Sequence, residues 1–500
     1  MSGLDNEQHR LLIVSNRLPT VISKIPGGSW QINPGAGGLV TALAPVLRNR
    51  GGIWIGWPGV VNEDGIDITE LMEEAKKHSG YRLKPVLLSN WEKENYYRGF
   101  ANEIIWPLFH DLQTRCQFYP EYWRAYRTVN HKFCEVIYQN AHRDDFIWVH
   151  DYHLMSVAKE LRTKGMKNRL GFFLHIPFPP LDIFLKLPWR FQILHHLLQY
   201  DLIGFQTLRD RRNFVGCIRA LMKDTFVTGK GSRSTILTGP REVLAGAFPI
   251  SIDFNEFAQH AESQEVSDTA WYIHEEFADL KIILGVDRLD YTKGIPEKLL
   301  AYRNALRRYP ELQGKVVMAQ VVVPSRWEIP HYNNLKEEIE RLVGEINGEF
   351  TRPGWVPLHY IYRNLDRPEL LAYYRTAEIM LTTPWKDGMN LVAKEYCACN
   401  IEQNGVLILS EFAGSTAQMY RHSLVVNPHD IEAVADAIHK AYHMPVEDRA
   451  RRMRTMRRAI RKQDVFWWVN AFLQAAIDKR LDSFPVLEEW VPQHEMKEYG

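Results

Sequence analysis

Charged and polar residues crowd into the segment Trp385–Glu395, where an apolar run ends. Asp387 and Gly388 follow the strand-like run 379–383 and precede a run with helical character. At a strand-to-helix corner, backbone N–H groups and the positive helix end can face an anion or sugar hydroxyls. Glu395 lies two turns beyond Gly388 on the same helix face, where its carboxylate could bind a ribose diol. The pattern indicates a nucleotide-sugar pocket, and an ordinary strand–helix corner is the alternative.

A second cluster of charges follows the apolar run 281–285. Arg288 and Lys293 bracket a predicted strand-to-helix loop there. A departing nucleoside diphosphate develops negative charge on its oxygens, and two fixed cations would stabilise that charge without proton transfer. The alternative is a pair of surface cations beside Asp287 and Asp290. Because one chain carries both segments, we favour the binding role.

The elements that must position these residues follow an alternating pattern. Short apolar runs alternate with longer amphipathic runs, which predicts an α/β fold with parallel sheets covered on both faces. The predicted strands form two series: Leu11–Ser15, Ile53–Gly56, Phe146–His150, Leu170–His175 and Leu202–Phe205, then Ile282–Val286, Val316–Val323, Leu358–Tyr362, Ile379–Thr383, Val406–Ser410 and Leu424–Asn427.

The two series of strands are separated near residues 248–253. We therefore expect two doubly wound domains facing a cleft, over residues 1–250 and 251–462, with ligands beyond the carboxyl ends of the strands. The strongly apolar run Val465–Ile477 predicts a terminal helix. A helix this apolar must be shielded from water by other parts of the protein. We therefore expect residues 463–485 to pack back on the first domain.

Composition narrows the function classes. The 500 residues carry 61 basic and 60 acidic side chains, so a net charge of +1 gives no general attraction to nucleic acid or to an anionic membrane. The 5 cysteines include no CxxC pair, which favours reduced thiols and a cytoplasmic location. The polar N-terminus shows no signal peptide, and no apolar run approaches the roughly 20 residues that span a bilayer.

Five motifs together resemble the trehalose-6-phosphate synthases, glycosyltransferase family 20. They are RLDYTKG at 288–294, KDGMNLVAKEY at 386–396, Gly37-Gly38-Leu39, His150-Asp151-Tyr152-His153 and His175-Ile176-Pro177-Phe178-Pro179. The likeness covers nearly the whole chain. It implies a retaining glucosyltransferase of the GT-B fold, with two Rossmann-like domains. It also implies a reaction in which glucose passes from UDP-glucose to glucose 6-phosphate, giving α,α-trehalose 6-phosphate and UDP.

The resemblance assigns a donor site. Arg288 and Lys293 would bind the UDP pyrophosphate, in agreement with the charge argument, and Glu395 would bind the ribose. The donor-binding residues that the resemblance implies are Gly38, His175, Arg288, Lys293, Asp387, Gly388, Met389, Asn390, Leu391, Val392 and Glu395.

The resemblance also assigns an acceptor site, with Arg17 and Arg326 at the phosphate. The full acceptor-binding set is Arg17, Trp57, Tyr97, Trp106, Asp151 and Arg326, although each aromatic residue taken alone is more often a core residue. The catalytic residues would be Asp151, His175, Arg288, Lys293 and Asp387. The acceptor hydroxyl would attack on the face that UDP leaves, so the protein would supply positioning and electrostatics. The sequence does not distinguish this mechanism from double displacement.

A metal site is the weaker interpretation of His150, Asp151 and His153, which have ligand-like spacing. No HExxH motif occurs, and we expect no metal and no cofactor besides the donor substrate UDP-glucose. The sequence also lacks a GxGxxG after the first strand of either domain and a P-loop, which argues against a dehydrogenase and a P-loop ATPase.

Two functional alternatives stay open. One is a related GT-B glucosyltransferase with another phosphorylated acceptor, and the other is a non-catalytic regulator that senses sugar phosphates. Because Arg288, Lys293, Asp387 and Glu395 are all present, the regulator is disfavoured. The bulky Trp385 leaves the choice among UDP-, GDP- and ADP-glucose open. No phosphatase motif is visible, so a separate phosphatase would act on the product, and a homo-oligomer is compatible with the sequence.

Overall fold

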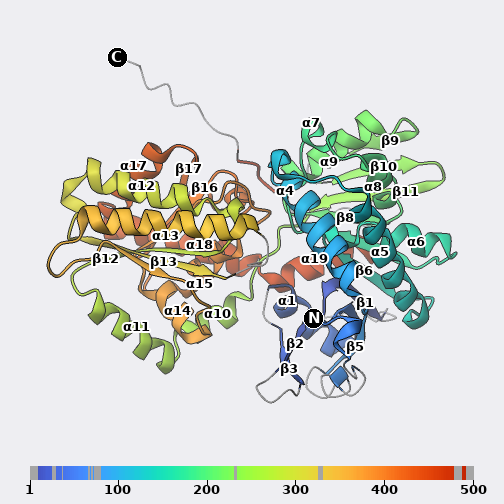
Figure 1. The fold of residues 1–500 in the computed structure, drawn as a ribbon, viewed down its shortest axis with the longest axis horizontal. Coiled ribbons are helices and arrows are strands. Elements are labelled where there is room, and N and C mark those ends of the chain that lie inside the picture. Colours follow the sequence, from blue (N-terminus) through green and yellow to red (C-terminus); the bar gives the residue numbers. More distant parts are fainter. Residues whose placement is uncertain are drawn as a thin grey trace. The chain divides into compact units, whose positions relative to one another are not determined.

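The computed structural model describes residues 10–24, 30–35, 38–65, 68, 71–72, 80–229, 233–324, 330–477 and 487–490. The chain forms two compact units (Figure 1). The first comprises Met1–Ile250 and Phe466–Leu487, and the second comprises Ser251–Val465 and Glu488–Gly500. Each unit is built on a sheet whose central strands are parallel, so the predicted α/β class is confirmed.

The first unit contains a sheet of 9 strands in the order β5-β4-β1-β6-β7-β8-β11-β10-β9. The seven strands from β5 to β11 pair in parallel, and β10 and β9 add an antiparallel edge. Their bounds are β1 Leu11–Arg17, β4 Gly52–Trp57, β5 Arg82–Pro85, β6 Phe146–His150, β7 Arg169–Phe173, β8 Leu202–Phe205, β9 Thr225–Thr228, β10 Arg233–Thr238 and β11 Arg241–Ala247. Every residue of β4 and of β6 is buried, as expected for parallel strands covered on both faces.

The helices of the first unit connect these strands. The long helix α5 begins with Pro120, whose fixed φ suits the first helical turn, and it buries Trp123, Tyr126 and Phe133 along one face. The bounds are α1 Gly38–Arg50, α3 Asn90–Glu92, the π-helix η2 Lys93–Ile105, α4 Trp106–Phe109, α5 Pro120–Asn140, η4 Tyr152–Leu154, α6 Val157–Thr163, α7 Leu181–Phe184, α8 Arg190–Leu197 and α9 Leu208–Leu221.

The second unit contains a sheet of 6 parallel strands in the order β14-β13-β12-β15-β16-β17. Figure 1 shows α12, α13 and α17 together over this sheet. The strands are β12 Lys281–Arg288, β13 Val316–Val323, β14 Leu358–Ile361, β15 Ile379–Thr382, β16 Val406–Ser410 and β17 Leu424–Val426. The helices are α10 Phe254–Ala261, α11 Gln264–Glu276, η5 Tyr291–Lys293, α12 Ile295–Arg308, η6 Pro310–Leu312, α13 Pro330–Phe350, α14 Arg367–Thr376, α15 Leu391–Cys399, α16 Thr416–Met419, α17 Ile431–Tyr442 and α18 Val446–Lys462.

The terminal helix α19, Val465–Ile477, packs on the sheet of the first unit. The ring of Phe472 stacks on Trp148 of β6 with centroids 4.3 Å apart and planes 3° apart. The same ring occupies space above two glycines, because a Cβ atom would lie 2.9 Å from Phe472 at Gly171 and 2.7 Å from it at Gly204. Side chains at these two positions would therefore force the helix away from β7 and β8.

Two parts of the fold differ from the expected pattern. The antiparallel strands β2 (Thr20–Lys24) and β3 (Trp30–Pro34) were not among the predicted strands. The strands β5, β9, β10 and β11 were not predicted. β5 mixes apolar with basic residues, β9 and β10 carry polar residues at the edge of the sheet, and β11 begins with two charged residues and contains a glycine. No helix among the described residues is both long and apolar enough to cross a membrane.

We expect Phe472→Ala to destabilise the first unit by about 3–5 kcal/mol, because it removes a fully buried ring and leaves a cavity over Gly171 and Gly204. Denaturant unfolding followed by fluorescence would measure the change. Gln474→Ala, at an exposed position of the same helix, is the matched control. Equal midpoints for both variants would contradict the packing role of Phe472.

Candidate active site

In each sheet the strand order reverses between two neighbouring strands. In the first unit the chain moves from β1 to β4 and β5 on one side and later to β6 on the other, and in the second unit β12 and β15 are the corresponding pair. Loops that leave such a pair diverge and open a crevice at the carboxyl ends of the strands. Of the predicted site residues, Arg17 and Arg288 end β1 and β12, whereas Asp151 and Asp387 follow β6 and β15.

In the first unit, four of the side chains near this edge form a continuous series of ring contacts. The Arg17 guanidinium lies 4.4 Å from the centre of the Trp57 ring, and that ring meets Tyr97 edge-on at 5.6 Å. Tyr97 in turn stacks on His153 at 6.1 Å. The Trp57 indole N–H donates to the Val60 carbonyl, which fixes the ring under the guanidinium. The structure therefore brings three predicted acceptor residues together and adds His153.

Trp106 belongs to the same aromatic group through its neighbours. Its ring lies 6.0 Å from Tyr152 and 4.3 Å from His110, and Tyr152 lies 3.9 Å from His153. The Trp106 side chain is almost fully buried. Trp106 thus packs behind the series Arg17–Trp57–Tyr97–His153, which agrees with a core role as well as with a place beside an acceptor.

Asp151 has a backbone conformation that L-residues rarely adopt, with φ 76° and ψ 165°. Conformations of this kind cost on the order of 1–3 kcal/mol and cluster at functional sites. Hydrogen bonds maintain it, since the Asp151 N–H donates to the Phe173 carbonyl at 2.8 Å and Oδ1 accepts from the His175 N–H at 3.2 Å. The carboxylate is thereby fixed between the ends of β6 and β7.

The half-buried His175 forms a pair with the fully buried His150. Nδ1 of His150 lies 3.1 Å from Nε2 of His175, so one nitrogen donates and the other accepts. Burial lowers the pKa of both rings, and the pKa of His175 falls to about 3. Both rings are therefore neutral near pH 7. Trp468 of α19 contacts both, with centroids 6.4 Å and 6.2 Å away. The terminal helix thus supports this part of the site.

In the second unit, Lys293 and Asp387 form an ion pair. Lys293 Nζ lies 2.5 Å from Asp387 Oδ2, although the two residues are 94 positions apart in the sequence. The Asn390 side-chain N–H₂ donates to the same carboxylate oxygen at 3.1 Å, and its carbonyl accepts from the Ala393 N–H that opens α15. The loops after β12 and β15 are therefore joined by charge. An ammonium has three N–H donors, so the pair with Asp387 uses one of them.

The bulky Trp385 has a structural place in these loops. The backbone N–H of Trp385 donates to the Thr292 carbonyl at 2.9 Å. The Trp385 ring would lie 2.9 Å from a Cβ atom placed at Gly294. Gly294 has φ 60°, which glycine adopts without strain. Trp385 therefore packs on the RLDYTKG loop rather than standing alone at the pocket.

The second side of the Asp387 loop is held by residues 412–415. The Asp387 N–H donates to the Phe412 carbonyl at 3.2 Å, and the Gly414 N–H donates to the Asp387 carbonyl at 3.1 Å. A Cβ atom at Gly414 would lie 1.9 Å from the Gly388 carbonyl oxygen, so only glycine permits this approach. The backbone of the predicted donor loop is thus fixed on both sides.

The two acidic residues of the RLDYTKG region are not surface partners. Asp287 is buried and pairs with the buried Lys298 at 2.5 Å, and Asp290 is buried and accepts from the Thr292 N–H at 3.0 Å. Arg288, at the end of β12, is exposed. A pair of surface cations balanced by surface carboxylates therefore does not describe this loop.

Glu395 lies on α15, the helix that Asn390 caps. Burial raises the pKa of its carboxyl, and Tyr374 donates a hydrogen bond to Oε2 at 3.0 Å. Leu391 and Val392, on the first turn, are partly buried, and Met389 is buried. Tyr374 was not predicted, because a tyrosine inside an amphipathic helix has no sequence signal that separates it from a core residue.

Two predicted residues remain to be placed. Gly38 is the first residue of α1, and Arg326 lies outside the described residues.

His150 was considered only as a metal ligand, and its pairing with His175 was missed. The adjacent motifs at the ends of β6 and β7 were the available signal, because parallel neighbours place their carboxyl ends side by side.

The histidine pair predicts a loss of stability in acid. Between its ordinary pKa of about 6.5 and its folded pKa of about 3, His175 binds a proton in the unfolded chain only, so the free energy of unfolding falls as the pH falls. We expect His175→Gln to reduce the stability lost between pH 7 and pH 5 by on the order of 1–2 kcal/mol. Denaturant unfolding at several pH values measures the free energy of unfolding that is lost over this range. His142→Gln, at an exposed histidine of the same unit, is the control, and parallel profiles for wild type and His175→Gln would contradict the prediction.

Comparison with known proteins gives the same kind of enzyme by sequence and by structure, the trehalose-phosphate synthases. A trehalose-6-phosphate synthase of Mycobacterium marinum is 42% identical over 476 residues, which cover 94% of this chain and 94% of that protein. The synthase of Mycobacterium tuberculosis is 42% identical over 472 residues, covering 93% and 94%.

Two solved structures are similar over the same span. The α,α-trehalose-phosphate synthase (UDP-forming) of Burkholderia xenovorans, in complex with glucose-6-phosphate, has a TM-score of 0.83 and 34% identity, covering 93% of this chain and 99% of that chain. A structure from E. coli bound with UDP-2-fluoro glucose has a TM-score of 0.83 and 35% identity, covering 93% and 98%. The predicted GT-B fold is confirmed by these neighbours.

The family model of glycosyltransferase family 20 matches residues 9–478. The resemblance that the five motifs indicated is therefore confirmed, and this chain belongs to glycosyltransferase family 20.

Proposed function

We propose that this chain transfers glucose from UDP-glucose to glucose 6-phosphate and releases α,α-trehalose 6-phosphate and UDP. The observation that supports it most directly is the Lys293–Asp387 ion pair, which joins the loops after β12 and β15. Asn390 donates to the same carboxylate, and the exposed Arg288 ends β12. The M. marinum relative is named for this synthesis, and the two solved neighbours bind glucose-6-phosphate and a UDP-glucose analogue.

In the proposed donor site, Arg288 and Lys293 neutralise the pyrophosphate. A fixed cation acts without reorganising at the moment when charge develops on the leaving group. Asp387, the Gly388–Asn390 backbone, Leu391 and Val392 hold the glucose and the nucleotide, and the half-buried Glu395 accepts from the ribose hydroxyls. Gly38 permits close approach of the backbone to the phosphates.

In the proposed acceptor site, the Arg17 guanidinium binds the phosphate of glucose 6-phosphate, because its planar fork matches phosphate oxygens. Its position over Trp57 presents the N–H groups along one plane. Tyr97 and Trp106 form the wall of the sugar site, and Asp151 accepts from an acceptor hydroxyl. Arg326 is proposed for the same phosphate on the sequence resemblance alone.

We propose that the transfer retains the anomeric configuration. The acceptor hydroxyl attacks on the face that UDP leaves, and the departing phosphate accepts its proton. Two features suit this route. The His150–His175 pair is neutral near pH 7, so His175 can bond a donor hydroxyl without adding charge. Asp151, held by two hydrogen bonds, orients the acceptor. Positioning and electrostatics then lower the barrier.

Three wider features are part of the proposal. The 5 unpaired cysteines suit a reducing, cytoplasmic location. The proposed reaction uses no cofactor besides its two substrates. A homo-oligomer is compatible with the fold. We also propose that a separate phosphatase removes the phosphate from the product.

The reaction itself is tested by measuring UDP release from UDP-glucose with and without glucose 6-phosphate, with mass analysis of the product. Release that requires the acceptor, with formation of a disaccharide phosphate, supports the proposal. Release with another phosphorylated acceptor only would retain the donor site and overturn the acceptor assignment. Binding of both ligands without release would favour the regulator.

We expect Arg288→Ala to lower kcat by on the order of 10²–10³, because it removes a fixed cation from the leaving group. Steady-state kinetics at saturating substrates measures the change. Arg341→Ala is the matched control, since Arg341 is exposed on α13 of the same unit and pairs with Glu345 one turn along that helix. A kcat for Arg288→Ala equal to that of the control would remove Arg288 from the proposed mechanism.

We expect Arg17→Ala to raise the KM for glucose 6-phosphate on the order of tenfold or more, with a smaller effect on UDP-glucose, because one charged hydrogen-bond partner of the phosphate is lost. Initial rates with each substrate varied in turn separate the two effects. Arg82→Ala, at an exposed position of β5, serves as the control. An unchanged KM for glucose 6-phosphate would show that another group binds the phosphate.

A further inference from the structure

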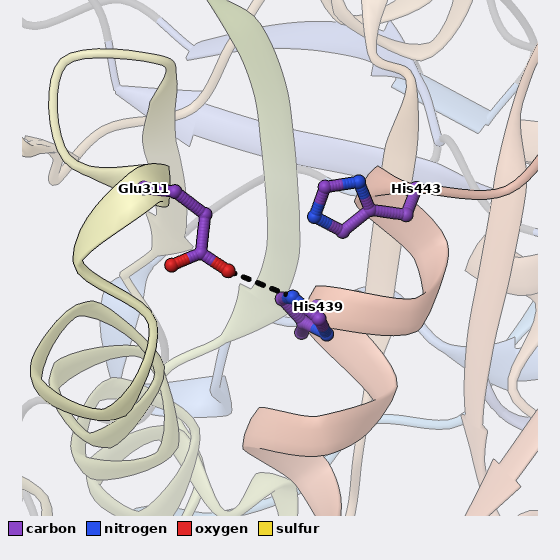
Figure 2. Close-up of side chains that lie close together, drawn as sticks. All are labelled: Glu311, His439 and His443. Atoms are coloured by element: carbon purple, nitrogen blue, oxygen red, sulfur yellow. Dashed lines mark hydrogen bonds and ion pairs between the residues drawn. The ribbon is translucent and has the colours of Figure 1, made fainter.

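A cluster of potential metal ligands lies on the second unit, outside the residues assigned to the proposed reaction. Glu311, His439 and His443 each offer one ligand atom, and these atoms lie within 4.8 Å of one another (Figure 2). They are the only described residues that form such a group of three. From these contacts we propose that Glu311, His439 and His443 bind a divalent transition-metal ion of the Zn²⁺, Co²⁺ or Ni²⁺ kind.

The two histidines are placed by one helix turn. His439 lies in α17, and His443 follows one turn later, where its N–H donates to the His439 carbonyl at 3.2 Å. Residues four positions apart lie on the same helix face, so both rings project to one side. Figure 2 shows the rings of His439 and His443 on the side of α17 that faces Glu311. Their centroids are 4.6 Å apart.

The carboxylate comes from a different element. Glu311 lies in η6, directly after α12, and its Oε1 is 2.9 Å from Nε2 of His439, although the residues are 128 positions apart. The packing of α12 on α17 fixes this approach, with Leu306, Leu312 and Ile438 fully buried. The third ligand atom is therefore held by the fold and not by the local sequence.

Neighbouring groups orient the central histidine and limit repulsion of a cation. The ring of His439 stacks on Tyr309 at 3.9 Å with planes 14° apart, and the Tyr309 hydroxyl donates to Asp436 at 2.6 Å. The nearby Arg308 pairs with Asp436 at 2.9 Å, which offsets its positive charge. The stacking on Tyr309 thus helps to fix the His439 ring in the orientation that points Nε2 at Glu311.

The chemistry of the ligand set selects the metal class. Imidazole nitrogen favours Zn²⁺, Co²⁺, Ni²⁺ and Cu²⁺, whereas Mg²⁺ and Ca²⁺ prefer oxygen. Zn²⁺ binds nitrogen and carboxylate oxygen at about 2.0–2.2 Å in a tetrahedron, which places ligand atoms roughly 3.4 Å apart. The three ligand atoms, which lie within 4.8 Å of one another, would reach this spacing by rotation of their side chains. Two nitrogens and one oxygen leave one position for water.

The position of the cluster indicates a structural role. α17 begins beside the loop that carries His429, which contacts Trp385 at 5.6 Å, and it ends at His443. A helix of 12 residues is about 18 Å long at 1.5 Å per residue. The metal site therefore lies at the opposite end of the helix from the proposed donor loop, and a bound ion would tie the end of α17 to the turn after α12.

The test is Zn²⁺ binding to the full-length chain without a histidine tag, measured by calorimetry, with Co²⁺ absorption as a second readout of nitrogen ligation. We expect one Zn²⁺ per chain at this site and a rise in the thermal midpoint on its addition. Loss of a ligand in His439→Ala or His443→Ala should weaken binding by at least the roughly 10- to 100-fold that loss of an orienting partner typically costs.

His260→Ala is the matched control, because His260 is an exposed histidine four residues from a glutamate with its ring 3.2 Å from that carboxylate. Circular dichroism of the metal-free variants checks that they fold. Binding that is absent in the wild type, or equal in wild type, His439→Ala and His443→Ala, would overturn the proposal. Glu311→Gln should also weaken Zn²⁺ binding, and an unchanged affinity would remove the carboxylate from the site.

Discussion

The reversal of strand order at the centre of each sheet is the constraint on which the proposed site depends. β1 and β6 are hydrogen-bonded neighbours, as are β12 and β15, yet the chain leaves each pair in opposite directions. The carboxyl ends of each pair lie side by side, so residues far apart in sequence meet there. Beyond this point the two loops diverge to opposite sides. Lys293 and Asp387 meet in this way, and their ion pair then joins the two loops.

Close backbone approaches maintain the shape of these loops. Gly414 lies against the Gly388 carbonyl, Gly294 lies against Trp385, and the backbone N–H groups of Asp387 and Trp385 donate to neighbouring loops. Each contact is a steric fit or a neutral hydrogen bond, which salt does not screen. The charged residues are consequently supported by an uncharged framework, and this arrangement suits the proposed binding and release of an anion.

Much of the fold could be predicted because parallel strands are apolar runs of the right length. The bounds of β6, β8, β13 and β16 agree with prediction residue for residue, and so do those of the helix α19. The antiparallel edge strands β9 and β10 could not be predicted, since their residues mix polar with apolar types and resemble those of a loop.

The candidate site could be predicted to the extent that motifs mark strand ends. Arg288, Lys293 and Asp387 could be named as candidates from their positions, and their roles stay predictions. The partner of Lys293, the stacking of Tyr97 on His153 and the approach of Glu311 to His439 could not be, because each contact joins elements that are distant in sequence. A local sequence pattern does not give the distance between elements that are far apart in the chain.

The place of α19 in the chain has a consequence for its synthesis. Phe472 and Trp468 cover Trp148, Gly171 and Gly204 in the first unit, but they follow the whole stretch Ser251–Val465 of the second unit. At the roughly 5–20 residues per second of translation, that stretch takes on the order of 10–40 s to make. During this interval the nascent first unit carries an uncovered apolar face on its sheet, so its final packing is completed only when the ribosome has delivered the end of the chain.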